Sequence, residues 1–393
     1  MKRALFVTYE NPFHATSGDA LYTCNIIEAL ALCCTVDIIY YDSNKVAPFI
    51  PEDKRSMFDR MICVPFVKKA PWRLVLSVLP GMIKSRSQTN YAASLKECIQ
   101  QSNPDLVVIN HFRMLSSLTV ARTDKRHIVY VSHNIETAIS KLAYQYQDLS
   151  VSKLVYYWDY IRTLLYERYM VRKCDSVLCI SEGDRSVFSS LHRKGAVLVR
   201  PFMRPSTLPW RDIYAFKRTA KKLLVVGSFV WGPKKDNIRQ LARHFATSQL
   251  SDQGYELQIV GRMKDALYHE LSSISESVCV VPNPENVEPY YAQASIALIP
   301  EVIGGGFKLK VLEAATNGLA IFAVNGSISK GDFEPDTHYV EAPSIIDLLM
   351  KVSERGQDTE SLYDMAQRCT RYVTEKYSLG KAHESIHTVV HAP

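Results

Sequence analysis

The 393-residue sequence contains no uncharged apolar run of the roughly 18 residues that a membrane-spanning helix needs. An apolar run follows the basic start of the chain, but Glu10 interrupts it, which is not the pattern of a secretory signal peptide. We find no low-complexity tract and no internal repeat. The nine cysteines form no C-x-x-C pair or metal-ligand cluster, which indicates reduced, mostly buried thiols. Together these absences predict an ordinary globular, cytoplasmic protein.

Two familiar phosphate-binding motifs are also missing. No G-x-x-x-x-G-K-[ST] is present, which excludes a P-loop NTPase, and no G-x-G-x-x-G follows the first predicted strand, which disfavours a dinucleotide-binding site. A nucleotide diphosphate held by another route remains open.

The positive charge is distributed unevenly. Lys and Arg exceed Asp and Glu by nine in residues 1–205 and fall short of them by two in residues 206–393. This excess favours an anionic partner for the first half, such as nucleic acid, a phosphorylated substrate or a membrane, although a solvated lysine-rich surface is an alternative. No stacking platform or nucleic-acid motif accompanies the charge, so we expect no nucleic-acid partner.

Short apolar, β-branched runs alternate with helix-like segments along the chain, the pattern of an α/β fold with doubly wound parallel sheets. The pattern restarts after a proline-rich stretch, which indicates two Rossmann-like domains. We predict an N-terminal domain over residues 1–200, a linker over 201–209, a second domain over 210–365 and a closing helix over 366–393 that packs back on the first domain. The expected strands are 4–8, 36–41, 106–110, 128–132, 176–180, 222–228, 256–262, 278–282, 296–300 and 320–324.

Residues 152–173 are predicted to form a helix whose Leu154, Trp158, Ile161 and Leu165 make an apolar stripe. We expect this stripe to pack in the core. A surface that binds the second substrate, for which the many tyrosines would be suited, is the alternative.

The stretch IGGGFKLKVLEAATNG, residues 303–318, combines three glycines with two lysines at the predicted start of a helix. Cations are unfavourable there because a helix N-terminus is already partly positive. An anionic ligand would remove the penalty, since Gly304, Gly305 and Gly306 let backbone N–H groups approach a phosphate while Lys308 and Lys310 supply charge. The alternative is a glycine loop with solvated lysines that contact Glu313.

Further along this helix, the Glu313 carboxylate is placed to accept both hydroxyls of a ribose. Gly318, just past Asn317, is expected to end the helix as its C′ residue.

Four stretches resemble the retaining glycosyltransferases of glycosyltransferase family 4, and the similarity covers nearly the whole chain. The most specific is YYAQASIALIPEVIGGGFKLKVLEAATNGLAIFAV (290–324). The others are VVGSFVWGPKKDN (225–237), LQIVGR (257–262) and SHNIE (132–136).

The resemblance implies a GT-B fold, with two Rossmann-like domains facing a cleft. The second domain would hold a nucleotide-diphosphate sugar and the first the acceptor. In that family two glutamates seven residues apart mark the donor site. Glu313 matches the second, whereas Gly305 stands in place of the first. Backbone N–H groups from Gly305 to Phe307 would then contact the sugar or phosphate, since Glu301, displaced by four residues, is a poor substitute.

The family's other phosphate ligands, an Arg and a Lys, lie after the first strand of the second domain. The corresponding loop here has no arginine, and Lys234 and Lys235 are its basic candidates. We predict that Lys308 is the main diphosphate ligand and catalytic residue of this domain, with Lys234 as the second ligand.

The family places a histidine that reaches the donor sugar where His133 stands. A neutral imidazole can accept a sugar hydroxyl and shield positive charge in the transition state. The alternative is a helix-capping histidine beside turn residues Asn134 and Glu136.

Gly18 follows the first strand and its loop, where it would let phosphate approach a helix start. Thr16 and Asp19 alone would also explain this stretch as a T-x-x-D capping box.

The sequence has no D-x-D, which argues against a metal-dependent GT-A transferase. We therefore expect a metal-independent hexosyltransferase without a cofactor, in which lysines and helix N-termini neutralise the leaving diphosphate. The resemblance implies retention of configuration by a front-face reaction.

Residues 66–88 mix basic and apolar side chains, a composition suited to an anionic membrane surface. This predicts a glycan or lipid-linked acceptor, a role in surface polysaccharide or glycoconjugate synthesis, and a location at the inner face of the membrane. An amphipathic element packed on its own domain is the alternative.

Two other functions compete with sugar transfer. Gly305 and the missing arginine also fit a non-catalytic GT-B partner subunit that binds a nucleotide sugar. A GT-B sugar-nucleotide epimerase is the third, and it would form product without an acceptor.

Overall fold

The chain divides into two compact units, which we describe separately. The computed structural model describes residues 1–13, 18–42, 50–122, 126–203, 212–301 and 307–391. Unit 1 comprises Met1–Phe202 and Ser378–Pro393, and unit 2 comprises Met203–Tyr377. Most of the predicted linker lies outside the described residues.

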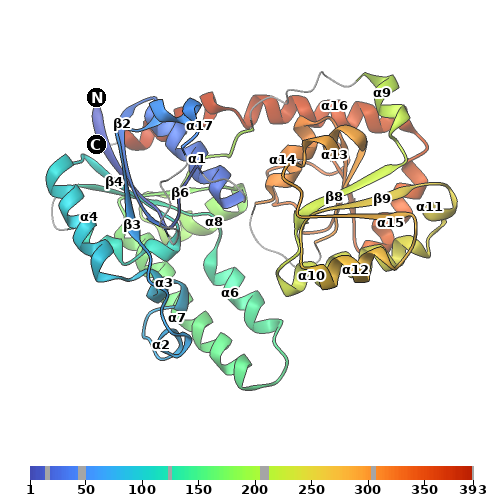
Figure 1. Cartoon of the computed structure of the whole chain (residues 1–393). Helices are drawn as coiled ribbons and strands as arrows, with labels where there is room; N and C mark the ends of the chain where they lie inside the picture. The colour runs from blue at the N-terminus through green and yellow to red at the C-terminus, as the bar shows by residue number, and fades with distance from the viewer. Residues whose placement is uncertain (14–17, 43–49, 123–125, 204–211, 302–306, 392–393) are drawn as a thin grey trace. The chain divides into compact units, whose positions relative to one another are not determined.

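Unit 1 is built on a seven-stranded parallel sheet with the order β3-β2-β1-β4-β5-β6-β7 (Figure 1). The apolar segments that form it are buried on both faces, as expected of a parallel sheet covered by helices. Its strands are β1 (Lys2–Val7), β2 (Cys34–Asp42), β3 (Arg60–Pro65), β4 (Leu106–Asn110), β5 (His127–Val131), β6 (Ser176–Cys179) and β7 (Val197–Leu198).

Helices follow most of these strands, and α17 from the end of the chain packs on α1. The α-helices of unit 1 are α1 (Gly18–Ala31), α2 (Pro71–Val75), α3 (Gly81–Arg86), α4 (Thr89–Ser102), α5 (Ser117–Ala121), α6 (Glu136–Gln145), α7 (Val151–Lys173), α8 (Glu182–Leu191) and α17 (Leu379–Val390). Two 3-10 turns are η1 (Glu52–Met57) and η2 (Phe112–Met114).

Unit 2 has a six-stranded parallel sheet with the equivalent order β10-β9-β8-β11-β12-β13. Its strands are β8 (Lys222–Ser228), β9 (Glu256–Arg262), β10 (Val278–Pro282), β11 (Ile296–Ile299), β12 (Ala320–Val324) and β13 (Val340–Ala342). Its helices are α9 (Ile213–Arg218), α10 (Gly232–Ala246), α11 (Gln249–Asp252), α12 (Asp265–Ser272), α13 (Glu288–Gln293), α14 (Leu309–Thr316), α15 (Ile345–Arg355) and α16 (Thr359–Lys376).

Glycine is required where β8 and β9 lie side by side. A Cβ added to Gly261 would stand 1.8 Å from the carbonyl oxygen of Gly227, and Gly261 has φ +144°. Only glycine fits this position. Gly261 therefore allows β9 to lie against the backbone of β8 at this position.

The ten strands predicted from the sequence are all present, with ends within two residues of the prediction. The three that the prediction missed are β3, β7 and β13, and each lies at the edge of its sheet. Edge strands are short or partly polar because only part of their surface is buried. They therefore lack the apolar run on which the prediction relies.

The predicted helix over residues 152–173 is confirmed as α7, but the prediction that its apolar stripe packs in the core is wrong. Leu154 is 69% exposed and Leu165 is 60% exposed. The helix buries a different set of side chains, which includes Met170 and Val171 near its C-terminal end. In Figure 1, α6 and α7 project beyond the sheet of unit 1, which leaves the start of α7 with little to pack against.

No helix in the described parts of the chain has the length and apolar character needed to cross a bilayer.

Candidate functional site

Each unit carries a polar cluster at the carboxyl ends of its strands. In both sheets the strand order reverses direction beside the first strand, between β1 and β4 and between β8 and β11. Ligands of open α/β sheets bind beyond the carboxyl ends at such a point. The clusters found there contain His133 in unit 1 and Lys308 in unit 2.

His133 follows β5 and is held by Asn110, the last residue of β4. Nε2 of His133 lies 2.8 Å from the side-chain oxygen of Asn110. The imidazole is buried and packs edge-on against Tyr22, with 5.0 Å between ring centroids. His133 is therefore anchored in the sheet and does not cap α6, the alternative considered from the sequence.

A chain of hydrogen bonds fixes the orientation of the Asn110 amide. The hydroxyl of Thr23 donates to the carbonyl oxygen of Asp19 at 2.8 Å, so its lone pair is available to accept. The amide nitrogen of Asn110 donates to that hydroxyl at 3.0 Å and to Thr8 at 3.2 Å. The amide oxygen must therefore face His133, and Nε2 of His133 must carry the proton it donates.

The second ring nitrogen of His133, Nδ1, takes no part in these hydrogen bonds. Nδ1 is buried, has no hydrogen-bond partner among the described residues and lies 3.8 Å from a carboxylate oxygen of Asp19. In the neutral ring Nδ1 carries a lone pair, so two acceptors face the same space. A ligand hydroxyl could donate to one of them, and two hydroxyls of a sugar would satisfy both.

His111 lies beside His133, with 4.9 Å between the ring centroids. Its Nε2 is 3.8 Å from the second oxygen of Asp19 and 3.8 Å from Glu136. Burial lowers the pKa of His111 to about 4, so the ring is neutral at pH 7. Burial alone would raise the pKa of Asp19, but the Nε2–H group of His111, which faces the carboxylate, holds that pKa well below the usual range.

Asp19, His111 and His133 together offer one carboxylate and two ring nitrogens within 4.8 Å of one another, a set that could surround a divalent ion. The state of His111 argues against this. Its Nδ1 accepts a hydrogen bond from the backbone N–H of Arg113 at 3.5 Å, which places the ring proton on Nε2, the atom that faces Asp19. A protonated nitrogen cannot bind a metal. The donor set fits hydrogen bonding better than a metal centre.

Glu136 closes the cluster from the start of α6. Burial raises its pKa to about 8, and the nearby Glu167 and Asp19 add to the effect while Arg113 opposes it. Glu167 of α7 accepts hydrogen bonds from the backbone N–H groups of Glu136 and Thr137 at 2.7 and 3.0 Å. The Glu167 carboxylate therefore caps the N-terminus of α6, although Glu167 belongs to another helix.

Gly18 is the first residue of α1 and is exposed. Its place at a helix start agrees with the predicted phosphate approach but does not demonstrate it. Thr16, the other half of the predicted capping box, lies outside the described residues. Asp19 stands in the first turn, with its side chain toward the two histidines.

In unit 2, Lys308 occupies the N-cap position of α14 and Lys310 lies in its first turn. Lys310 forms an ion pair with Glu301, which follows β11. The alternative considered from the sequence, solvated lysines that contact Glu313, does not describe Lys310, whose ion pair is with Glu301. Part of the unfavourable charge at the helix start is therefore balanced within the chain.

Three lysines converge on Glu301. Burial would raise the pKa of Glu301, but Lys310, Lys308 and Lys234 lower it. The pKa of Lys308 is lowered to about 8 by burial and by repulsion from Lys310 and Lys234, against the attraction of Glu301. Lys234 comes from α10, after β8. The structure thus brings the two predicted phosphate ligands, Lys234 and Lys308, into one cluster.

Glu313 lies on α14 and accepts a hydrogen bond from the hydroxyl of Tyr291 at 2.8 Å. Burial raises the pKa of Glu313, although Tyr291 and Lys310 oppose the shift. Gly318 follows the C-cap residue Asn317 with φ +68°, so the predicted helix end is confirmed.

The three glycines predicted to contact the donor, Gly304, Gly305 and Gly306, lie outside the described residues. Phe307 is half-buried, and its ring packs near that of Tyr377, with 5.9 Å between centroids.

Sequence reasoning missed four contributors: Asn110, His111, Tyr291 and the central place of Glu301. Asn110 and His111 could have been noticed, because they are two consecutive polar residues where the apolar run LVVIN ends. Glu301 was weighed only as a replacement for the family's first glutamate. Its role among the lysines depends on the distance between β11 and α10, which the sequence does not show.

Comparison with known proteins supports the predicted fold. Residues 220–338 match the family model described as "Glycosyl transferases group 1". A search of curated proteins found no significant match.

Solved structures match the whole chain at low identity. Sucrose-phosphate synthase of Thermosynechococcus elongatus is 14% identical with a TM-score of 0.73, over 99% of this chain and 98% of that chain. HepE of Anabaena, solved with UDP and glucose, is 11% identical with a TM-score of 0.72, over all of both chains. A TarM variant from S. aureus, solved with fondaparinux, alpha-GlcNAc-glycerol and UDP, is 11% identical with a TM-score of 0.67, over all of both chains.

These structures are GT-B glycosyltransferases, and the two parallel sheets of this chain match them. The predicted fold class is confirmed: two Rossmann-like units of the GT-B type. At such identities the likeness establishes the fold, and the family match covers the greater part of unit 2.

Proposed function

We propose that the protein is a glycosyltransferase that moves a sugar from a nucleotide-diphosphate sugar to a hydroxyl of a glycan or lipid-linked acceptor. The lysine cluster of unit 2 is the observation that carries the proposal. It lies where β8 and β11 end and α14 begins, and the pKa of Lys308 is lowered there mainly by burial, with repulsion from Lys310 and Lys234 adding to the shift. A bound diphosphate would relieve that repulsion.

The nucleotide has a second contact in this proposal. Glu313, oriented by Tyr291, accepts the ribose hydroxyls, while Lys308 and Lys234 bind the diphosphate. Backbone groups of Gly304, Gly305, Gly306 and Phe307 approach the sugar or phosphate. HepE and TarM were both solved with UDP, which supports UDP as the first nucleotide to test.

His133 is the proposed catalytic residue of unit 1. Its free Nδ1 accepts a sugar hydroxyl, and the imidazole together with Asp19 stabilises positive charge that develops on the sugar. Gly18 allows the phosphate to approach the start of α1.

The reaction is proposed to proceed with retention and without a metal or other cofactor. Lysines and the start of α14 neutralise the leaving diphosphate, and a leaving phosphate oxygen takes the proton of the incoming hydroxyl. Retention rests on the resemblance to glycosyltransferase family 4, and metal independence rests on the absence of D-x-D from the sequence.

A lipid-linked acceptor would place the enzyme at the inner face of a membrane, in surface polysaccharide or glycoconjugate synthesis. The basic and apolar composition of residues 66–88 supports peripheral contact with an anionic bilayer. The alternative function, a non-catalytic partner subunit that binds the nucleotide sugar, is favoured by Gly305 in the place of the family's first glutamate.

Thermal unfolding of the full chain with UDP, GDP, ADP or CMP, each with and without Mg²⁺, tests the donor site. A ligand at a hundred times its Kd stabilises by about 2.7 kcal/mol, which gives a clear shift. We expect one diphosphate to stabilise without metal, and the Lys308→Ala and Glu313→Ala variants to lose the effect. Lys381→Ala, on α17, is the matched control and should retain it. Stabilisation by none of the nucleotides would contradict the proposal.

A further inference from the structure

Large hydrophobic side chains that face solvent are concentrated in two segments of unit 1. The first segment runs through α2 and the turn after it, where Leu76 is 77% exposed. The second is the α6–α7 hairpin, where Leu149 is 93% exposed. The exposed members are Val67, Trp72, Val75, Leu76, Val78, Tyr146, Leu149, Val151, Leu154, Tyr156, Tyr157, Trp158, Leu165 and Tyr169.

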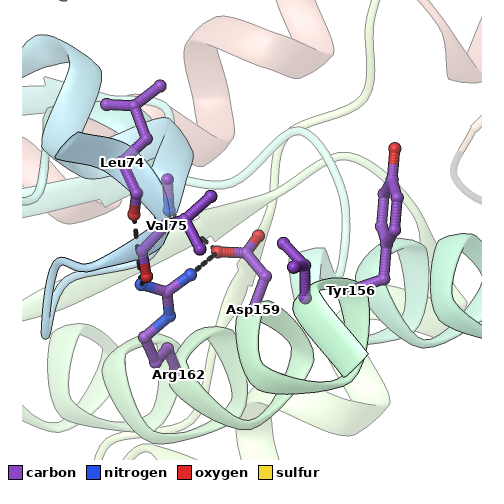
Figure 2. Close-up of a pocket in the computed structure, with 7 residues that line it drawn as sticks. Leu74, Val75, Tyr156, Asp159 and Arg162 are labelled. Carbon is purple, nitrogen blue, oxygen red and sulfur yellow. Dashed lines mark hydrogen bonds and ion pairs between the residues drawn. The ribbon is translucent and has the colours of Figure 1, made fainter. Parts of the chain in front are cut away.

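Arg162 of α7 joins the two segments. Its buried guanidinium donates to the backbone carbonyls of Leu74 and Val75 at 3.3 Å each, and also to those of Ser77 and Leu79. Asp159 accepts from Arg162 at 2.7 Å and from the backbone N–H of Gly81 at 2.9 Å. Figure 2 shows the contacts of Arg162 with Leu74, Val75 and Asp159.

A buried arginine that binds four carbonyls holds the turn in a defined conformation. Hydrophobic collapse would instead have buried Leu76 and Val78. The Arg162 network therefore presents apolar side chains to solvent on a rigid base, and α2 with α7 forms one surface. We call it the α2–α7 face: residues 67–78 and 146–169.

The charge around this face is positive. Residues 66–88 contain five basic residues and no acidic one. Lys68 is exposed, and the guanidinium of Arg73 lies 5.1 Å from the ring of Trp72. On the hairpin, Asp159 is paired with Arg162. Glu167 of α7 is buried and accepts a hydrogen bond from the first residue of α6. Asp148 is therefore the one exposed acidic residue of the hairpin.

We propose that the α2–α7 face docks on an anionic phospholipid bilayer. Leu, Val, Trp and Tyr side chains enter the interface, where amphipathic aromatic rings are favoured, and the basic residues bind lipid phosphates. The docking brings the enzyme to the lipid-linked acceptor and in that sense rests on the proposed function. From the sequence, only residues 66–88 were predicted to contact a membrane. The proposed face adds α7, and its exposed apolar stripe would then contact lipid.

Vesicle binding tests the proposal without any sugar donor, so its failure and the failure of sugar transfer are distinguishable. The full chain is sedimented with vesicles of phosphatidylcholine alone or with an equal part of phosphatidylglycerol. We expect binding to the anionic vesicles that weakens with salt. The tryptophan fluorescence of the chain should shift to the blue on binding, and Trp72→Phe should reduce the shift.

Two double variants separate the apolar and charged contributions. Leu149→Ser with Leu154→Ser should weaken binding about tenfold or more, because both side chains leave the interface. Lys68→Glu with Arg73→Glu should weaken it by a similar factor at low salt and by less at high salt. These residues are exposed or half-buried and outside the Arg162 network, so folding should be unaffected, as circular dichroism would verify.

Ile346→Ser with Met350→Ser is the matched control. These residues lie on α15 of unit 2 and are 52% and 54% exposed. The control should bind vesicles as the unmodified chain does. Absence of vesicle binding, or an equal loss in the control, would overturn the proposal. Self-association in solution that the Leu149 and Leu154 substitutions abolish, without vesicle binding, would assign the face to a second copy instead.

Discussion

The side-chain oxygen of Asn110 accepts a hydrogen bond from Nε2 of His133 at 2.8 Å. Because the amide nitrogen of Asn110 is committed to Thr8 and Thr23, this contact decides which ring nitrogen carries the proton. Asn110 is therefore a positioning residue, and Nδ1 is the nitrogen available to a ligand.

Asn110→Leu should lower kcat/KM by about tenfold or more, since a histidine in the wrong tautomer is a poor catalyst. Nitrogen-15 NMR of the imidazoles should show the Nε2–H tautomer of His133 in the unmodified chain and a mixture in the variant. In a His133→Ala background the same substitution should have little further effect on kcat/KM. Additive losses would show that Asn110 acts by another route.

Glu301→Gln should lower the melting temperature of the ligand-free chain. Without this carboxylate, Lys234, Lys308 and Lys310 repel one another in a buried site, at a cost of about 3–5 kcal/mol. Pyrophosphate should restore much of the loss and should stabilise the variant more than the unmodified chain, because it supplies the missing negative charge. Equal stabilisation of both proteins would mean that Glu301 does not balance the lysines.

Nucleotide affinity should fall as pH rises through about 8, the pKa of Lys308. Diphosphate binding favours the charged lysine, which is lost above that pH. Titration calorimetry with the stabilising nucleotide at pH 7 and pH 9 should show weaker binding at pH 9 for the unmodified chain. Lys308→Met should bind weakly at both pH values, and a pH dependence that persists in this variant would assign the effect to another group.

Glu136→Gln should increase stability at pH 8. The pKa of Glu136 is raised above its unfolded value, so the folded state holds a proton that the unfolded state releases between about pH 4.5 and pH 8. Stability from this group is therefore fully present at low pH and declines as pH rises through that window. Urea unfolding should show equal stability at pH 4 and a gain of about 4 kcal/mol for the variant at pH 8. No gain at pH 8 would show that ionisation of the Glu136 carboxyl does not destabilise the folded state.

The parallel strands were predictable because each is a local apolar run. Predicted and observed bounds agree for β4, β8, β9, β10 and β12. The exposed stripe of α7 could not be foreseen, since 3.6-residue periodicity shows that one face is apolar but not what covers it.

The candidate site was predictable in part. The glycine-lysine stretch pointed to Lys308 and Glu313, and the resemblance to glycosyltransferase family 4 pointed to His133 and Lys234, whose roles stay predictions. Their partners were not predictable, because the contact of Asn110 with His133 depends on the parallel register of β4 with β5. The grouping of the lysines around Glu301 depends in the same way on packing in unit 2.

The most direct test of glycosyl transfer is the release of nucleotide diphosphate by the full chain from UDP-, GDP- and ADP-sugars, with and without acceptor glycans. We expect acceptor-dependent release from one donor class, greatly reduced in His133→Ala and Lys308→Ala, with a product whose anomeric configuration matches the donor by NMR. Nucleotide binding without release from any donor would contradict sugar transfer and favour the non-catalytic partner subunit. Product formed without an acceptor would favour an epimerase.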